Sequence, residues 1–273
     1  MESKRLDALV CGLLGVSREY AKDLIQKGKV MVDGKTIIKP GAKFAENTAV
    51  VVDADPPKYV SRGGLKLEKA FEVFGFDVYG LNCMDVGAST GGFTDCMLQY
   101  GANKVFAVEN GHGQMVEKFL KDPRVISREG LDIRDLELAD LPFAPQFAAV
   151  DLSFISLTHV LPKISELLEN ESEALLLVKP QFEVGRGKVG KNGVVKNPKD
   201  HIEVLNKVCD AACSCGLQPV AVDFSPITGQ NGNLEYLLLV EKTHPSNVHL
   251  ALHDVTHVGI KRAVNNAFKE IKA

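Results

Sequence analysis

The chain has 273 residues, 45% hydrophobic and 25% charged, which suits a globular protein with one large and one small domain, or two modest domains. No apolar run reaches the roughly 20 residues that span a bilayer, and the charged first residues are not a signal peptide, so no membrane partner is expected. The six cysteines do not form a disulfide framework, which favours the cytoplasm, and a net charge of −3 argues against a uniformly basic polyanion binder.

Residues 1–55 are predicted to form a small α+β domain. Two short helices over 5–14 and 17–27 come first, with Ser17 as the N-cap of the second and Gly28 at its end.

A hairpin is expected next, because Asp33-Gly34 is a turn signal between residues 30–32 and 35–38. Residues 50–52 would close this small sheet. Residues 56–64 are then expected to form a basic linker, since Pro56-Pro57 favours an extended backbone at a domain boundary.

From residue 65 to 273, strand and helix patterns alternate, which predicts an α/β domain with a mostly parallel, seven-stranded, doubly wound sheet. No helix separates the last two strands, so they should form an antiparallel hairpin at one edge. The expected strands cover 83–86, 105–108, 125–126, 147–150, 174–178, 220–224 and 234–240, and the clearest helices cover 65–74, 93–100, 159–168 and 201–215.

A glycine-rich loop, Asp85-Val86-Gly87-Ala88-Ser89-Thr90-Gly91-Gly92-Phe93, joins the first of these strands to a helix. Its glycines would let the backbone turn tightly and approach a ligand, and the amides at the helix N-terminus would face that ligand. Such a loop alone fits a tight turn or a nicotinamide site. The GxxxGG spacing, the acidic Asp85 and the lack of a Walker lysine favour a cationic or hydroxylated nucleotide-like cofactor instead.

Two further acids are candidates for the same cofactor. Glu109 ends the next strand, where an acid suits a ribose diol. Asp132 follows the third strand and could accept the adenine amino group, or it could simply cap a helix.

Four polar residues stand where apolar elements would bring them together. Asp151 and Lys179 each directly follow a buried strand, so both should lie at the carboxyl edge of the sheet. Glu235 is near the start of the last strand, which reaches the same edge if it is antiparallel, and Lys66 is on the helix before the sheet. This set suits methyl transfer to a hydroxyl, because a lysine can stabilise the forming alkoxide or, if neutral, take its proton.

These motifs closely resemble those of the TlyA family of rRNA 2′-O-methyltransferases, also called haemolysins, whose catalytic domain is FtsJ-like. The family's Lys-Asp-Lys-Glu set falls on Lys66, Asp151, Lys179 and Glu235. Two positions differ from the family's usual residues, since members usually have Asp in place of Glu109 and Asn in place of Asp132. The most specific matching stretches are 59–67, 85–94, 149–157, 178–185 and 232–236.

The N-terminal domain resembles an S4 RNA-binding domain. Matching positions include Arg5-Leu6-Asp7, Ser17-Arg18, Gly28-Lys29-Val30 and Val32-Asp33-Gly34. Phosphate contacts of this kind position RNA without reading its sequence. The cations expected to contact RNA are Arg5, Arg18, Lys22, Lys27 and Lys29, with Arg62 in the linker and Arg186 and Lys188 in a second basic segment.

The resemblance implies an S-adenosylmethionine-dependent rRNA (cytidine-2′-O)-methyltransferase with a Rossmann-like catalytic domain. Its partners would be ribosomal RNA and ribosomal subunits, with no obligate protein partner. Three alternatives are a non-catalytic ribosome-assembly factor, a membrane-active haemolysin and a small-molecule O-methyltransferase.

No metal site is expected. Cys209, Cys213 and Cys215 lack a matching CxxC pair, and His249, His253 and His257 are interpreted as surface residues despite their four-residue spacing.

Overall fold

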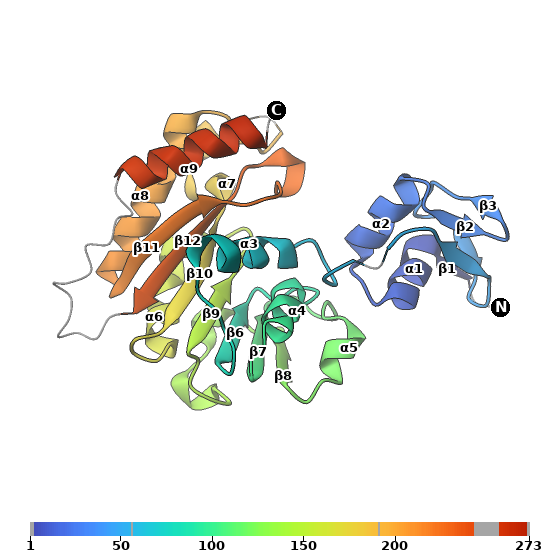
Figure 1. The fold of residues 1–273 in the computed structure, drawn as a ribbon, viewed down its shortest axis with the longest axis horizontal. Helices are drawn as coiled ribbons and strands as arrows, with labels where there is room; N and C mark the ends of the chain where they lie inside the picture. The colour runs from blue at the N-terminus through green and yellow to red at the C-terminus, as the bar shows by residue number, and fades with distance from the viewer. Residues whose placement is uncertain (1–2, 56, 191, 243–256, 272–273) are drawn as a thin grey trace.

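The computed structural model describes residues 3–55, 57–190, 192–242 and 257–271 (Figure 1). Its N-terminal part is a small α+β domain, as predicted. Ser17 caps the second helix by accepting a hydrogen bond from Tyr20 N at 3.2 Å, and Gly28 follows that helix with a φ of 71°. The elements are β1 (Ser3–Arg5), α1 (Leu6–Leu14), α2 (Arg18–Gln26), β2 (Val30–Val32), β3 (Lys35–Thr36), β4 (Lys43–Ala45) and β5 (Val50–Val52).

The larger domain alternates strands and helices. These are α3 (Gly64–Phe74), β6 (Asn82–Val86), α4 (Gly92–Gln99), β7 (Lys104–Glu109), α5 (Glu117–Leu120), β8 (Val125–Glu129), β9 (Phe147–Val150), α6 (Leu161–Leu167), β10 (Glu173–Val178), α7 (Pro180–Glu183), α8 (Pro198–Ser214), β11 (Leu217–Phe224), β12 (Tyr236–Lys242) and α9 (His257–Glu270).

The seven strands lie in the order β11-β12-β10-β9-β6-β7-β8. All neighbours pair in parallel except β12, which is antiparallel to both β10 and β11. The predicted mostly parallel sheet with an antiparallel hairpin at one edge is therefore confirmed.

Some predicted element bounds were wrong. The helix expected from 159 starts as a 3-10 turn at Leu157–His159, and α6 begins only at Leu161. The last strand begins at Tyr236, because its first backbone partner is Val178, so residues 234 and 235 belong to the preceding loop. The return strand of the small hairpin ends at Thr36 rather than 38, because only Lys35 and Thr36 pair with β2.

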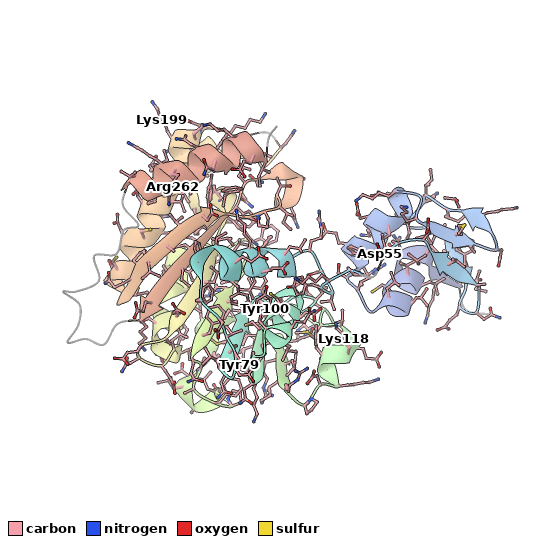
Figure 2. The ribbon with its side chains drawn as sticks, in the orientation of Figure 1. Asp55, Tyr79, Tyr100, Lys118, Lys199 and Arg262 are labelled. Atoms are coloured by element: carbon pink, nitrogen blue, oxygen red, sulfur yellow. The ribbon has the colours of Figure 1, made fainter. Side chains whose placement is uncertain are left out.

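Helices cover both faces of the sheet (Figure 1). Successive strand residues point to opposite faces, so Met84 packs into a core with α6, α8 and α9, while Cys83 packs into a second core with α3 and α4. Charged side chains such as Lys199 of α8 and Arg262 of α9 are exposed (Figure 2).

The small domain has its own core and meets the larger one through the linker. Ser17 N donates a hydrogen bond to Val60 O at 2.7 Å, and Arg62 forms a 2.7 Å ion pair with Glu19 of α2. These contacts place the α1–α2 turn beside the carboxyl edge of the sheet.

Candidate active site

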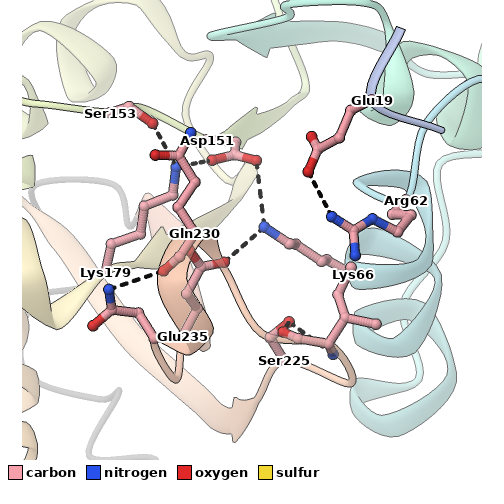
Figure 3. A network of polar contacts seen from close by, with 11 residues as sticks. Glu19, Arg62, Lys66, Asp151, Ser153, Lys179, Ser225, Gln230 and Glu235 are labelled. Atoms are coloured by element: carbon pink, nitrogen blue, oxygen red, sulfur yellow. Dashed lines mark hydrogen bonds and ion pairs between the residues drawn. The ribbon is translucent and has the colours of Figure 1, made fainter. Parts of the chain in front are cut away.

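The structure brings Lys66, Asp151, Lys179 and Glu235 together at the carboxyl edge of the sheet (Figure 3). Lys66 Nζ lies 2.6 Å from Glu235 Oε2 and 3.9 Å from Asp151 Oδ2, and Lys179 Nζ lies 2.6 Å from Asp151 Oδ1. The strand directions cause this convergence. β9 and β10 run in parallel and end at this edge, where the antiparallel β12 begins.

The four side chains form a largely buried set with two positive and two negative charges. Both lysine side chains are 10% exposed and that of Glu235 is 3% exposed. Burial alone would lower the pKa of Lys66, but the charges of Asp151 and Glu235 outweigh it and raise that pKa above its usual value. Burial likewise opposes ionisation of Asp151, yet Lys66 and Lys179 hold the pKa of this carboxyl below its usual range. Lys66 is therefore an ammonium and Asp151 a carboxylate at neutral pH.

Lys179 has one carboxylate neighbour among these four, whereas Lys66 has two. Lys179 Nζ also donates a hydrogen bond to Ser153 Oγ at 2.9 Å and lies 5.8 Å from the centre of the Phe182 ring. The sequence analysis did not select Ser153, although it stands two residues after Asp151 on the same strand-end loop.

The glycine-rich loop lies beside this set, as its position after β6 predicts. Gly87 and Gly91 have φ values of 85° and 94°, which favour glycine. A Cβ on Gly87 would lie 2.3 Å from the backbone oxygen of Asp151, and one on Gly92 would lie 2.2 Å from Ser61 Oγ. Protein atoms occupy the space that each Cβ would take, so close packing of the chain requires glycine at both positions, and the approach of the loop backbone to a ligand stays a prediction. These glycines let the loop pack against the catalytic segments.

Asp85 is the buried acid of this loop. Its Oδ2 accepts hydrogen bonds from Thr94 N at 2.8 Å and Thr94 Oγ1 at 2.6 Å. Its Oδ1 is buried and has no hydrogen-bond partner in the part of the chain that the structure describes. Burial raises the pKa of Asp85 to about 7. An unpaired buried carboxylate oxygen fits a cationic group, such as the amino group of the S-adenosylmethionine that the resemblance implies.

A cavity of about 880 Å³ joins the loop to the four catalytic candidates. The α1–α2 turn of the small domain forms part of its wall, so both domains line it. Gln181 also lines this cavity, and its buried Oε1 has no hydrogen-bond partner among the described residues. The loop residues on the wall are Asp85, Gly87, Ala88, Ser89, Thr90, Gly92 and Phe93.

Glu109 and Asp132 are not among the residues that line the cavity. The carboxylate of Glu109 accepts hydrogen bonds from Ser89 N at 2.9 Å and Gly111 N at 2.7 Å, so it supports the glycine-rich loop. Asp132 caps a 3-10 helix by accepting from Arg134 N at 3.0 Å and pairs with the Arg134 side chain at 2.6 Å. Their roles toward ribose and adenine stay predictions.

The expected RNA-contacting cations with described side chains are all exposed. Arg18 and Arg62 also line the cavity, which places two of them next to the catalytic candidates. Most of the expected cations form ion pairs: Arg5 and Arg18 with the buried Asp7, Lys27 with Asp23, Lys29 with Asp53, and Lys188 with Asp200 and Glu203. Lys22 is exposed on α2, and the side chain of Arg186 lies outside the described part.

Within the described residues, no group of three or more His, Cys, Asp or Glu side chains is placed to hold a metal ion. His249, His253 and the side chain of His257 lie outside those residues. No helix in the same ranges is long and apolar enough to cross a membrane.

Comparison with known proteins gives two family matches. The model of FtsJ-like methyltransferases matches residues 59–242, and the model of S4 domains matches residues 4–50.

Relatives match over most of their length. A Bacillus subtilis protein named as an rRNA methyltransferase, YqxC, is 43% identical over 87% of this chain and 85% of its own. The 16S/23S rRNA (cytidine-2′-O)-methyltransferase TlyA of Mycobacterium tuberculosis is 40% identical over 94% of this chain and 97% of its own. A solved structure of a hemolysin from Streptococcus thermophilus is 41% identical, covers 100% of this chain and 98% of its own, and superposes with a TM-score of 0.79.

Proposed function

Because this chain belongs to the FtsJ-like methyltransferase family and carries an S4 domain, we propose that it methylates the 2′-hydroxyl of a cytidine ribose in ribosomal RNA. The observation that carries the proposal is the contact of Lys66, Asp151, Lys179 and Glu235 in a cavity shared with the glycine-rich loop. In this proposal, residues 1–55 position the RNA, residues 56–64 link the two domains, and residues 65–273 carry out catalysis. The enzyme acts in the cytoplasm, where ribosomes are.

S-adenosylmethionine supplies an electrophilic methyl group, so the protein must provide a deprotonated ribose oxygen. Lys66 stays an ammonium, held by two carboxylates, and stabilises the negative charge that develops on the 2′-oxygen. Lys179 accepts the proton of the 2′-hydroxyl when it is present as a neutral amine, and its contacts with Asp151 and Ser153 Oγ hold its Nζ in place. Asp151 orients both lysine side chains, and Glu235 orients Lys66.

The small domain positions the RNA. Its exposed cations bind phosphates without reading sequence, and Arg18 and Arg62 extend this basic surface to the mouth of the cavity. Both domains line the cavity, so RNA that these cations bind would lie next to Lys66, Asp151, Lys179 and Glu235.

The test is to incubate ribosomal subunits with S-adenosylmethionine and measure ribose methylation. The wild-type protein should transfer methyl groups, and Lys179→Ala should abolish transfer while it still binds the cofactor. Lys121→Ala, which removes an exposed lysine just after α5, is the matched control and should remain active.

Full activity of Lys179→Ala would contradict the role of this lysine. Subunit binding without methylation would favour the non-catalytic assembly factor, and lysis of liposomes by the purified protein would favour the membrane-active haemolysin.

A further inference from the structure

Asp151 and Lys179 stand on two neighbouring loops that extend past the end of the sheet. The first loop, residues 151–157, follows β9, and the second, residues 179–183, follows β10 and forms α7. Backbone pairing between the two strands ends at Val150 and Leu176. Beyond that point, side chains make the contacts that join the two loops, so these contacts set the distance between the two catalytic groups.

Three such contacts join the loops. Lys179 contacts Asp151 and Ser153 at the cavity. The rings of Phe154 and Phe182 lie 5.2 Å apart, and Phe154 is 83% exposed. Glu183 makes the third contact, and its side chain is more deeply buried than that of Lys179.

Glu183 fastens the far end of the first loop to the second. Its Oε2 accepts a hydrogen bond from Ser156 Oγ at 2.6 Å, and its Oε1 accepts one from Leu157 N at 2.7 Å. Lys207 of α8 lies 3.4 Å from the carboxylate and donates to the Glu183 backbone oxygen at 3.0 Å. The Glu183 side chain is 1% exposed, while that of Lys207 is 48% exposed.

This anchor is close to the catalytic groups along the chain. Glu183 ends the single-turn helix whose N-cap is Lys179, and Ser156 caps the 3-10 turn that ends the loop of Asp151. A shift at Glu183 therefore passes along the single turn of α7 to Lys179 and, through Ser156, along residues 152–155 to Asp151. Removing the carboxylate would leave Ser156 Oγ and Leu157 N without their acceptor, and the first loop would have to move to satisfy them.

We propose that Glu183 is a positioning residue, which holds the loop of Asp151 against the helix of Lys179 and so fixes the geometry of the catalytic pair. The inference rests on the proposed function, in which these two groups serve methyl transfer. Glu183 touches neither substrate nor cofactor in this account. Its contribution should therefore appear in turnover rather than in binding.

The experiment compares Glu183→Gln with wild-type protein on ribosomal subunits. Glutamine keeps the size of the side chain but loses the charge and pairs poorly with two donors. We expect kcat to fall by about 10- to 100-fold, the scale of a misplacement near 1 Å, while KM for the subunits and Kd for S-adenosylmethionine change by less than about 3-fold. Lys207→Met is the matched control, because it removes the half-exposed cation and leaves both hydrogen bonds to Ser156 and Leu157 in place. It should retain kcat within about 3-fold.

A second variant, Ser156→Ala, removes one of the two donors and keeps the test decisive if Glu183→Gln fails to fold. It should lower kcat by several-fold without changing cofactor affinity, and in the double variant the two effects on log kcat should be less than additive. Unchanged kcat in Ser156→Ala and in any folded Glu183→Gln overturns the proposal. A loss of turnover accompanied by equal losses of cofactor binding and thermal stability also overturns the proposal, because it indicates a merely structural role. Absence of methylation by the wild-type protein would instead refute the proposed function.

Discussion

Replacement of Asp85 by asparagine should stabilise the cofactor-free protein, and more so as the pH rises. Asp85 is 1% exposed, and its burial raises the pKa from 3.8 to about 7. The folded protein thus binds this proton more tightly than the unfolded chain does. The proton on the Asp85 carboxyl group stabilises the folded protein fully below about pH 3.8, and this stabilisation is lost as the pH rises through about 7.

The magnitude follows from the two pKa values. Their difference corresponds to about 4 kcal/mol, at about 1.4 kcal/mol for each pKa unit. By linkage, the burial of Asp85 lowers the free energy of unfolding by about 2 kcal/mol near pH 5 and by about 4 kcal/mol near pH 8. Asparagine avoids this cost, and its carbonyl can still accept from Thr94. Its amide adds an unpaired buried donor, but that cost does not depend on pH.

The assay is urea unfolding of cofactor-free wild-type and Asp85→Asn protein at the two pH values. The free energy of unfolding of the variant relative to wild type should increase by about 2 kcal/mol from about pH 5 to about pH 8. Asp210→Asn, on the exposed face of α8, is the matched control. A difference that stays constant or decreases over this range would refute the reasoning that burial outweighs the two hydrogen bonds from Thr94 and sets the charge state of Asp85.

Three further predictions follow from the same region. The affinity for S-adenosylmethionine, measured by calorimetry, should rise with pH through about 7 in wild type and stay flat in Asp85→Asn, because the cationic cofactor favours the ionised carboxylate. Gly87→Ala should lower the free energy of unfolding by more than about 2 kcal/mol and reduce methyl transfer, because the new Cβ meets Asp151 O and the φ of 85° is strained; an unchanged urea midpoint would contradict this. Asn233→Ala should lower the free energy of unfolding by about 1 to 3 kcal/mol and speed proteolysis of residues 192–195, because Asn233 accepts a hydrogen bond from Val195 N and donates one to Gly193 O; proteolysis at the wild-type rate would show that other contacts hold these residues.

The sheet and the approximate position of the site could be predicted from the sequence because they follow from strand direction. Asp151 and Lys179 come directly after apolar runs, and parallel strands end at one edge. Glu235 joined them through the expected antiparallel hairpin, even though it precedes β12 rather than lying in it. Lys66 depended more on the resemblance, since a lysine on an amphipathic helix has no strand to fix its position.

Other features depend on tertiary contacts that leave no periodic pattern. β1 consists of Ser3, Lys4 and Arg5, all exposed, so no hydrophobic alternation marks its pairing with β4. Glu183 reads as a surface acid at the end of a short helix, and only the loop after β9 makes it a buried acceptor. The wall that the α1–α2 turn adds to the cavity depends on how the linker folds, which composition does not reveal.

The most direct test of the central claim is nucleoside analysis of ribosomal RNA after incubation of unmethylated subunits with the protein and isotope-labelled S-adenosylmethionine. We predict that the label appears in 2′-O-methylcytidine, and that Lys179→Ala protein, which still binds the cofactor, leaves none. Label on a base or on another nucleoside, or no label at all from wild-type protein that binds both cofactor and subunits, would contradict this prediction.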